Sequence, residues 1–309
     1  RVCNHPCESK CRAGATGGDP VAIRSLKRFI TDRIDPASFV PQRENWNQGK
    51  EPPRVAVVGA GPAGLTAAHM LSLKGCKVTL FEGEKRPGGM LSCVIPPYRM
   101  PSNVIEMEIE SLLDENITLQ CGQAMGTDFD VDHLFNDGYS AVLLALGAHK
   151  SKPLRLENED YEGVIPSIEF LKAFNLRGQS LARGRVGIIG GGNSAIDAAR
   201  TALRHKEVSE VILLYRRTRD EMPAFEEEIE AAMQEGVQIQ TLVSPLRVIG
   251  EEKKITGLEC IRNELGDADA SGRRRPVPKE GTEHIVVLDT LIVAIGEDSG
   301  VDALTPALS

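Results

Sequence analysis

The sequence predicts an α/β protein with two parallel-sheet domains, and two observations carry this prediction. Two short glycine-rich segments, residues 59–64 and 190–195, lie far apart in the 309-residue chain. Each follows a short apolar run rich in β-branched residues and precedes an alanine-rich stretch with helical spacing. This order of strand, turn and helix is typical of parallel strands joined by crossover helices. The predicted fold is therefore α/β with two Rossmann-like domains, preceded by a short helical segment.

The two turns have the residue pattern that accommodates a dinucleotide. They read Gly59-Ala60-Gly61-Pro62-Ala63-Gly64 and Gly190-Gly191-Gly192-Asn193-Ser194-Ala195. The first glycine permits a tight bend, the second lets the backbone approach a pyrophosphate, and the third lets the helix pack on the strand. The pyrophosphate meets unpaired N–H groups at the positive end of the helix dipole. Two turns predict two bound dinucleotides, and a tight turn without a ligand is the alternative for each.

The residue that ends the second strand of each unit separates the two ligands. Strand 77–82 ends in Glu82, roughly 20 residues after the first turn, where a carboxylate binds a ribose diol and repels a 2′-phosphate. Strand 211–215 is followed by Arg216 and Arg217, and guanidinium groups favour a 2′-phosphate through bidentate bonds. The first site therefore predicts FAD and the second NADPH. A solvated basic strand end, or an enzyme that uses NADH, is the alternative interpretation of the arginines.

The seven cysteines fall into two groups. Cys3, Cys7 and Cys11 are regularly spaced near the start of the chain, and the other four are scattered singly. We expect the scattered cysteines to be small buried hydrophobic residues. Three thiolates at short spacing suggest iron–sulfur or zinc ligation, with iron–sulfur favoured beside a flavin and ordinary surface thiols as the alternative. No Cys-x2-Cys or Cys-x4-Cys pair lies beside the flavin segment, which argues against a disulfide reductase.

Composition narrows the class of protein. The chain has 36 Lys and Arg against 44 Asp and Glu, a net charge of −8, which argues against a nucleic-acid partner. No apolar stretch approaches the roughly 18 residues of a membrane-spanning helix, and the first residues do not read as a signal peptide. We therefore expect a cytoplasmic enzyme. The chain does not begin with Met, and we expect both ends to be cut from a longer protein.

The predicted organisation has four parts. Residues 1–50 form a partial iron–sulfur segment, with an amphipathic helix at 22–30 and a polar linker. Residues 51–165 form an FAD-binding domain and residues 166–288 an NAD(P)H-binding domain, whereas residues 289–309 return into the first domain.

Several segments within these domains have their own predicted roles. Gly88 and Gly89 form a glycine pair directly before Met90. Without side chains, this pair lets the backbone lie close to a flat ring system. Strand 141–146 runs into Gly147, where backbone again meets the flavin. A helix at 165–174 leads into the second domain, whose acidic helix from residue 225 exposes a solvated face before an antiparallel section.

The order of these motifs resembles a known family, the small (β) subunit of NADPH-dependent glutamate synthase. The resemblance rests on Gly89-Met90-Leu91, Ile95-Pro96-Pro97-Tyr98-Arg99-Met100-Pro101, Tyr215-Arg216-Arg217, Glu221-Met222-Pro223-Ala224 and Gly272-Arg273-Arg274-Arg275-Pro276. The flavin modules of dihydropyrimidine dehydrogenase and of ferredoxin–NADP transhydrogenases are built in the same way. The sequence departs from the family at both ends. Family members have further cysteines before the position of Arg1, and after the position of Gly296 they continue into a glycine–aspartate segment.

The resemblance implies a site for each cofactor. FAD is held by Gly59, Ala60, Gly61, Pro62, Ala63, Gly64, Glu82, Gly89, Met90, Arg99 and Met125, with Gly147 beside them. NADPH is held by Gly190, Gly191, Gly192, Asn193, Ser194, Ala195, Arg216, Arg217, Ala294, Ile295 and Gly296. Cys3, Cys7 and Cys11 match ligands of [4Fe–4S] clusters in the full-length family members.

The resemblance also implies electron transfer without a catalytic side chain. NADPH passes hydride to FAD, and electrons leave through an iron–sulfur cluster to a protein partner such as the glutamate synthase large subunit. The reverse direction is the first alternative, with a ferredoxin- or hydrogenase-linked partner that supplies electrons to NADP. A non-catalytic docking subunit is the second.

Overall fold

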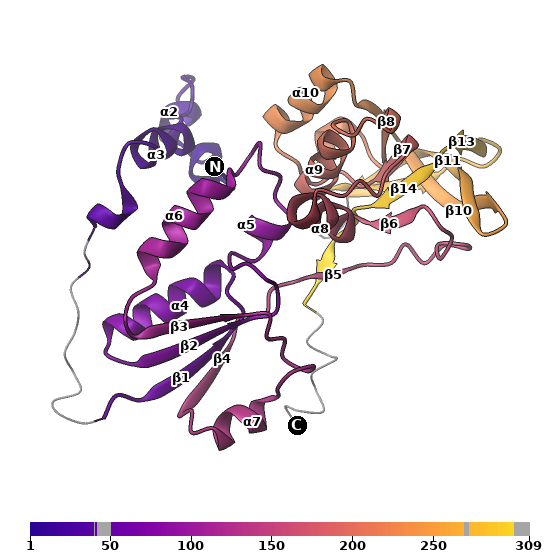
Figure 1. The fold of residues 1–309 in the computed structure, drawn as a ribbon. Helices are drawn as coiled ribbons and strands as arrows, with labels where there is room; N and C mark the ends of the chain where they lie inside the picture. Colours follow the sequence, from indigo (N-terminus) through magenta and orange to yellow (C-terminus); the bar gives the residue numbers. More distant parts are fainter. Residues whose placement is uncertain (40, 42–50, 269–271, 300–309) are drawn as a thin grey trace. The chain divides into compact units, whose positions relative to one another are not determined.

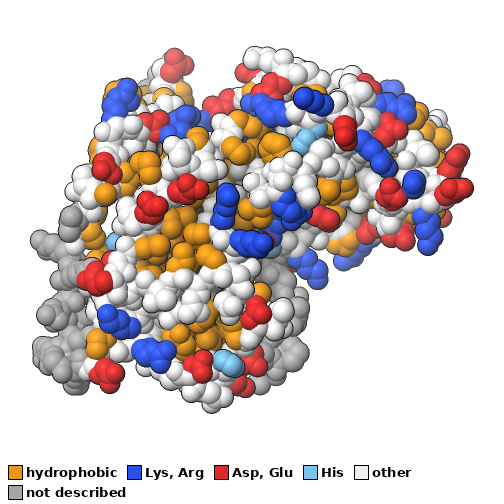
Figure 2. Space-filling model, viewed as in Figure 1, with side chains coloured by type: hydrophobic (Ala, Val, Ile, Leu, Met, Phe, Trp, Pro, Cys, Tyr) orange, Lys and Arg blue, Asp and Glu red, His pale blue; other side chains and the backbone are white. Residues whose placement is uncertain are grey.

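The computed structural model describes residues 1–39, 41, 51–268 and 272–299, which fold into two compact units. The first unit contains Arg1–Gly147, and the second contains the described residues from Ala148 onward (Figure 1). Acidic and basic side chains are interspersed over the face shown in Figure 2. Among the described helices, none is both long and apolar enough to cross a membrane.

The first unit is built on a four-stranded parallel sheet. Its strands are β1 (Arg54–Val58), β2 (Lys77–Glu82), β3 (Ile117–Cys121) and β4 (Ala141–Leu144), in the spatial order β3-β2-β1-β4. Its longer helices are α4 (Pro62–Leu73), α6 (Ser102–Leu112) and α7 (Val131–Asn136). Helices α4 and α6 lie on one side of the sheet and α7 on the other (Figure 1).

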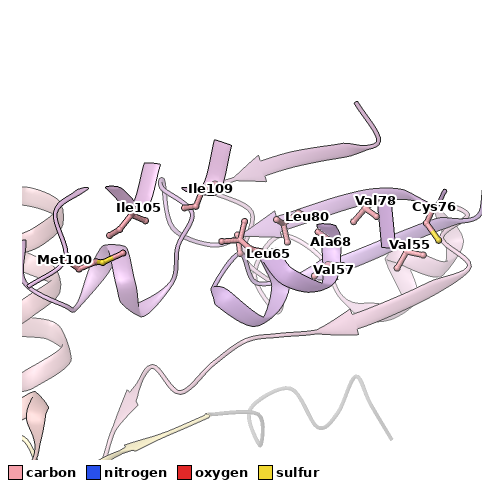
Figure 3. Close-up of a cluster of buried hydrophobic side chains, with 11 residues drawn as sticks. Val55, Val57, Leu65, Ala68, Cys76, Val78, Leu80, Met100, Ile105 and Ile109 are labelled. Carbon is pink, nitrogen blue, oxygen red and sulfur yellow. The ribbon is translucent and has the colours of Figure 1, made fainter. Parts of the chain in front are cut away.

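Alternation along β1 gives this sheet two apolar faces. Val57 belongs to the cluster that also contains Leu65 of α4 and Leu80 of β2, and these side chains lie together in Figure 3. Val58 belongs to a second cluster, with Leu134 of α7. Because successive side chains of a strand point to opposite faces, a central strand covered on both sides is apolar throughout. The continuous apolar run at residues 55–58 therefore predicted a buried strand.

Short helices precede the sheet or connect its strands. They are α1 (Pro6–Ser9), α2 (Arg12–Ala15), α3 (Ile23–Thr31), the 3₁₀ turn η1 (Pro36–Ser38) and α5 (Met90–Cys93). The amphipathic helix predicted at 22–30 is confirmed as α3. Most of the predicted linker lies outside the described residues.

The second unit contains a five-stranded parallel sheet. Its strands are β6 (Val164–Pro166), β14 (Thr290–Val293), β7 (Gly184–Ile189), β8 (Val208–Tyr215) and β9 (Gln238–Thr241), in that spatial order. Helices α8 (Ser167–Arg177), α9 (Asn193–Ala202) and α10 (Glu226–Glu235) accompany these strands. The short strands β5 (Lys150–Ser151) and β15 (Glu297–Asp298) pair with each other.

The predicted antiparallel section is confirmed as a second sheet of this unit. It contains β10 (Val243–Glu251), β11 (Lys254–Ala268), β12 (Arg274–Pro278) and β13 (His284–Val287), with the last two both paired to β11. Leu258 of this sheet is buried with Leu214 of β8 and Leu291 of β14. An apolar cluster therefore joins the antiparallel sheet to the parallel one.

Two predicted boundaries are wrong. Residues 289–309 were expected to return into the first domain, but β14 pairs with β6 and β7 inside the sheet of the second unit. All four residues of β14 are buried, as expected for a central strand covered on both faces. The boundary predicted after residue 165 lies instead after Gly147. Residues 300–309 lie outside the described part of the chain.

Two element ends also differ from the prediction. The helix expected at 165–174 begins at Ser167, because the residues before it form β6 beside β14. The strand expected over 141–146 ends at Leu144. The carbonyl of Ala145, just beyond that end, lies against the first glycine turn.

Candidate functional site

The first glycine turn has a geometry that depends on Gly59 and Gly64. Gly59 has φ of +104°, and a Cβ there would overlap the carbonyl oxygen of Ala145. A Cβ on Gly64 would overlap the carbonyl oxygen of Gly59, so helix α4 packs against the turn only without a side chain at Gly64. Gly61 differs, because the nearest heavy atom to its Cβ position is Gly89 Cα at 3.8 Å, an ordinary contact. The fold itself therefore does not require glycine at position 61.

Glu82 is held beside this turn at the carboxyl end of β2. Its side chain is 8% exposed, and one carboxylate oxygen accepts the Ala60 N–H at 2.8 Å. The other oxygen accepts the Glu84 N–H at 2.9 Å. Each carboxylate oxygen has a second lone pair, so both can also accept a hydroxyl donor. Glu82 therefore lies beside the first turn, and its contact with a ribose stays a prediction.

The predicted glycine pair lies against the same turn. The Gly88 N–H donates to the Ala60 carbonyl at 2.8 Å. Gly89 has φ of +56°, and a Cβ there would lie 2.8 Å from Gly61 Cα. Met90 then begins helix α5. The structure therefore brings the turn, Glu82 and the 88–90 segment together.

The remaining residues predicted for FAD have varied surroundings. Arg99 is half-buried, and its backbone N–H donates to Pro96 at 2.9 Å. Met125 packs against the cluster around Val58. Gly147 has φ of +69° and ends the first unit. Their contacts with FAD stay predictions.

The second glycine turn repeats the pattern at the end of β7. Gly190 has φ of +146°, and its Cβ position overlaps the carbonyl oxygen of Ala294 in the segment after β14. A Cβ on Gly191 would overlap the ring of Tyr215. Gly192 precedes helix α9, and the nearest atom to its Cβ position is in Pro223 at 3.9 Å. Gly192 therefore corresponds to Gly61, because a Cβ at either position would make only ordinary contacts.

A pocket of about 580 Å³ lies at this turn, beyond the carboxyl ends of β7, β8 and β14. Most residues predicted for NADPH line it, namely Gly190, Gly191, Gly192, Ser194, Arg216, Arg217, Ala294, Ile295 and Gly296. Asn193 and Ala195 are outside the lining. The Asn193 side chain instead accepts the Phe225 N–H at 3.1 Å, and Ala195 is buried in helix α9.

The two predicted arginines have different surroundings. Arg216 is exposed at the pocket, whereas Arg217 is 4% exposed. The Arg217 Nε donates to the Arg274 carbonyl at 2.6 Å. The structure therefore does not present them as two equivalent guanidinium groups.

Sequence reasoning missed part of the pocket lining. The missed residues are Leu154, Leu156, Ile189, Leu214, Tyr215, Pro223, Val243, Ser244, Pro245, Arg273 and Glu297. Tyr215 and Pro223 belong to motifs already noted, and Arg273 opens the basic run 273–275. Their membership in these motifs could have marked them as candidates for the pocket. No spacing rule, however, predicts that they lie beside the glycine turn.

An anionic side chain organises the segment beside the pocket. The pKa of Glu221 is held below its ordinary value by a hydrogen bond from the Thr218 hydroxyl and, secondarily, by Arg274. The Arg274 Nε donates to this carboxylate at 2.8 Å. The Tyr215 hydroxyl donates to the Glu221 carbonyl at 2.7 Å. Glu221 therefore connects the end of β8 to the start of β12.

The N-terminal cysteines do not form a complete metal site by themselves. Cys3 and Cys7 are exposed and Cys11 is half-buried. The Val21 N–H lies 3.4 Å from the Cys11 sulfur, and this bond is the largest cause that lowers the pKa of the Cys11 thiol. Within the described ranges, no group of three or more His, Cys, Asp or Glu side chains is placed to hold a metal ion. Cluster ligation by these cysteines stays a prediction.

The scattered cysteines agree with their predicted role as small apolar residues. Cys76, Cys93 and Cys260 are buried, and Cys121 is half-buried. Burial raises the pKa of the Cys260 thiol to about 12. All seven cysteines lie within the described residues, and none of them forms a disulfide bond.

The chain is similar to known proteins in its family profile, in its sequence and in its fold. The sequence profile of a family described as pyridine nucleotide-disulphide oxidoreductase matches residues 53–307. The beta subunit of NADP(+)-dependent formate dehydrogenase from Moorella thermoacetica is 42% identical, over 96% of this chain and 45% of that protein. The small chain of glutamate synthase [NADPH] from Escherichia coli is 34% identical, over 96% of this chain and 65% of that protein.

Among solved structures, FprA from Mycobacterium tuberculosis has a similar fold. It superimposes with a TM-score of 0.72 at 20% sequence identity, and the match covers 80% of this chain and 71% of FprA. At that identity the likeness concerns the fold. The chain spans less than half the length of the formate dehydrogenase subunit and about two thirds of the glutamate synthase chain.

Proposed function

This chain belongs to the pyridine nucleotide-disulphide oxidoreductase family, and from that premise we propose that it is an NADPH-dependent flavin oxidoreductase module. It binds FAD at the first glycine turn and NADPH at the second, and it exchanges electrons with a partner protein. The observation that carries the proposal is the contrast between the two turns, because a buried carboxylate lies beside one and three arginines line the pocket at the other.

The residues at the first turn fit FAD. Gly61 precedes helix α4, where backbone N–H groups attract a pyrophosphate, and only Gly89 Cα, at 3.8 Å, lies near its Cβ position. Glu82 is fixed by two backbone donors and can accept the ribose hydroxyls. A 2′-phosphate placed beside this carboxylate would be repelled. These features favour FAD over NADPH at this turn.

The residues at the second turn fit NADPH. The lining of the pocket has three arginines and one acid, Glu297. Arginine is well suited to phosphate because its planar guanidinium can donate two parallel hydrogen bonds. Gly192 repeats the open position of Gly61 at the start of α9. NADH lacks the 2′-phosphate, so the positive charge of these arginines stabilises its binding less than that of NADPH.

The proposed chemistry needs no protein nucleophile. A bound FAD supplies the conversion between the two-electron chemistry of NADPH and one-electron transfer. The protein binds and orients the two dinucleotides. No two of the seven cysteines have the Cys-x2-Cys or Cys-x4-Cys spacing of a reducible pair, so we propose electron exchange with a partner and not with an internal disulfide.

The relatives favour a partner subunit. The names of both the formate dehydrogenase and the glutamate synthase relatives describe one subunit or chain of an NADP(H)-linked enzyme. We propose that this module likewise works with a redox-active protein, with electrons flowing in either direction. We propose a reducing compartment such as the cytoplasm, where cysteines stay without disulfide bonds as they do in the described residues.

Cys3, Cys7 and Cys11 have a limited part in this proposal. The described residues do not fit a complete cluster, because three thiols not gathered into one site cannot replace the four ligands of [4Fe–4S]. We propose that they act as thiolate donors together with ligands from elsewhere in a longer protein. The lowered pKa of Cys11 supports this role.

An anaerobic titration tests the proposed function. The protein is reconstituted with FAD, and NADPH is added while the visible absorption of the flavin is recorded. We expect one FAD per chain and complete bleaching by about one equivalent of NADPH, since one hydride reduces one flavin. Failure to retain FAD, or a bound flavin that NADPH cannot reduce, would contradict the proposal.

A further inference from the structure

We propose that Arg273, which lies directly before strand β12 of the antiparallel sheet, determines specificity for the 2′-phosphate of NADPH together with Arg216. In this arrangement Arg217 is a positioning residue that holds Arg273 at the pocket. This inference rests on the proposed function and deepens it. It names a residue that belongs to neither the glycine turn nor the parallel strand that follows it.

The first step concerns the geometry of neighbouring residues. Arg216 and Arg217 follow β8 directly, and successive side chains of an extended chain point to opposite sides. The structure agrees, because Arg216 is exposed while Arg217 is 4% exposed and donates to the backbone of Arg274. The two side chains therefore differ in their access to a phosphate in the pocket, and the third arginine of the lining, Arg273, comes from another element.

Arg273 is the residue that the fold brings to this place. It is half-exposed and lines the same pocket as Arg216, Gly191 and Gly192. It comes from the antiparallel sheet, whose strand β12 pairs with β11 through Ala268 and Arg274. Two guanidinium groups from different elements can contact one phosphate from two sides, each with bidentate geometry.

The start of β12 is fastened to the end of β8 by several contacts. Arg217 donates to the Arg274 carbonyl at 2.6 Å, and Arg274 donates to Glu221 at 2.8 Å. On the neighbouring strand β11, Asn263 donates to the Arg216 carbonyl at 2.9 Å. These bonds hold the backbone of Arg216 and the residue after Arg273 together, so both arginines are carried to the same pocket before a ligand binds.

The charge of the lining favours an additional phosphate. Arg216, Arg217 and Arg273 are opposed by one acid, Glu297. Arg275, two residues beyond Arg273, is exposed and is not part of the lining. The chain therefore provides a matched control, an arginine with the same charge that lies two residues further along, within β12, and outside the lining.

The test compares two nucleotides that differ only in the position of one phosphate group. Adenosine 2′,5′-bisphosphate and ADP are titrated calorimetrically into the full chain with FAD bound, at fixed ionic strength. We expect Arg273→Ala to weaken binding of the 2′,5′-bisphosphate by about tenfold or more, since a hydrogen bond to a charged group is lost. Binding of ADP should stay nearly unchanged, and Arg275→Ala should affect neither nucleotide.

The outcomes separate this inference from the proposed function. Equal weakening of both nucleotides, no weakening of either, or the same effect in Arg275→Ala would overturn the role of Arg273 while NADPH binding stands. An unaltered protein that binds neither the 2′,5′-bisphosphate nor NADPH would overturn the proposed function and this inference with it. Arg273→Lys should recover part of the affinity, because it keeps the charge but loses the bidentate geometry.

A double-mutant cycle tests the positioning role of Arg217. We expect Arg217→Gln to reduce the preference for the 2′,5′-bisphosphate in the unaltered background and to add little in the Arg273→Ala background, because both changes remove one interaction. If the reduction in the double variant equals the product of the reductions in the two single variants, Arg217 binds the phosphate by itself. That result would overturn its assignment as a positioning residue.

Discussion

Replacing Gly61 by valine is predicted to remove FAD without unfolding the protein. Gly61 precedes helix α4 in an extended conformation, with φ of −74° and ψ of −178°, which any residue can adopt. The nearest atom to its Cβ position is 3.8 Å away. The valine side chain therefore meets little protein, but it occupies the space where the pyrophosphate would approach the backbone.

The expected magnitudes differ for folding and for binding. Gly61 is half-buried and lies outside the apolar core, and a substitution there without strain changes the free energy of unfolding by about 0.5 kcal/mol or less. Loss of a backbone hydrogen bond to a charged phosphate costs about 1.5–3 kcal/mol, and displacement of the ligand breaks more than one such bond. We therefore expect FAD affinity to fall by at least about a hundredfold, while the unfolding midpoint without FAD stays nearly the same.

The assay uses the second turn as its control. Gly192 has the same open position at the start of helix α9, so Gly192→Val should remove NADPH and leave FAD bound. Flavin content after purification and calorimetric titration with NADPH measure the two effects separately. A Gly61→Val protein that retains one FAD per chain, or that loses NADPH in its place, would refute the assignment of the first turn.

Three further predictions concern stability and the cysteines. Gly64→Ala should lower the free energy of unfolding of the first unit by about 3 kcal/mol, seen as a fall in Tm, because its Cβ would overlap the Gly59 carbonyl; an unchanged Tm would contradict this packing. Burial lowers the pKa of His205 from 6.5, so this side chain stabilises the fold above that pH, and the stabilisation is lost as the pH falls through the folded pKa. Denaturant midpoints should therefore depend less on acid pH in His205→Asn, and identical profiles would contradict the burial argument. Cys7→Ser should lower iron and sulfide content in the full-length protein prepared without oxygen and leave flavin reduction by NADPH intact; unchanged iron content would make these cysteines ordinary thiols.

The parts of the fold governed by local chemistry were predictable from the sequence. Strand β2 was expected at residues 77–82 and lies there, because an apolar run bounded by turn residues marks a buried strand. Gly59 and Gly190 both have positive φ, as the tight bend requires. Glu82 ends this strand as expected, because one helix and one strand set its distance from the turn.

The parts that depend on long-range pairing were not predictable. The apolar run of β14 would suit a central strand in either sheet, and nothing in its composition identifies β6 and β7 as its neighbours. The same limit applies to Arg273, because its place at the pocket depends on the pairing of β12 with β11 and on a bond from Arg217. Periodicity reports which face of an element is buried, and it carries no information about the partner strand.

The most direct test of the central claim is a crystal structure of the protein with FAD and NADP⁺ both bound. The account predicts the FAD pyrophosphate at the start of α4, with ribose hydroxyls on Glu82. It predicts the NADP⁺ pyrophosphate at the start of α9, with its 2′-phosphate between Arg216 and Arg273. One dinucleotide at both turns, or a 2′-phosphate bound away from these arginines, would contradict the account.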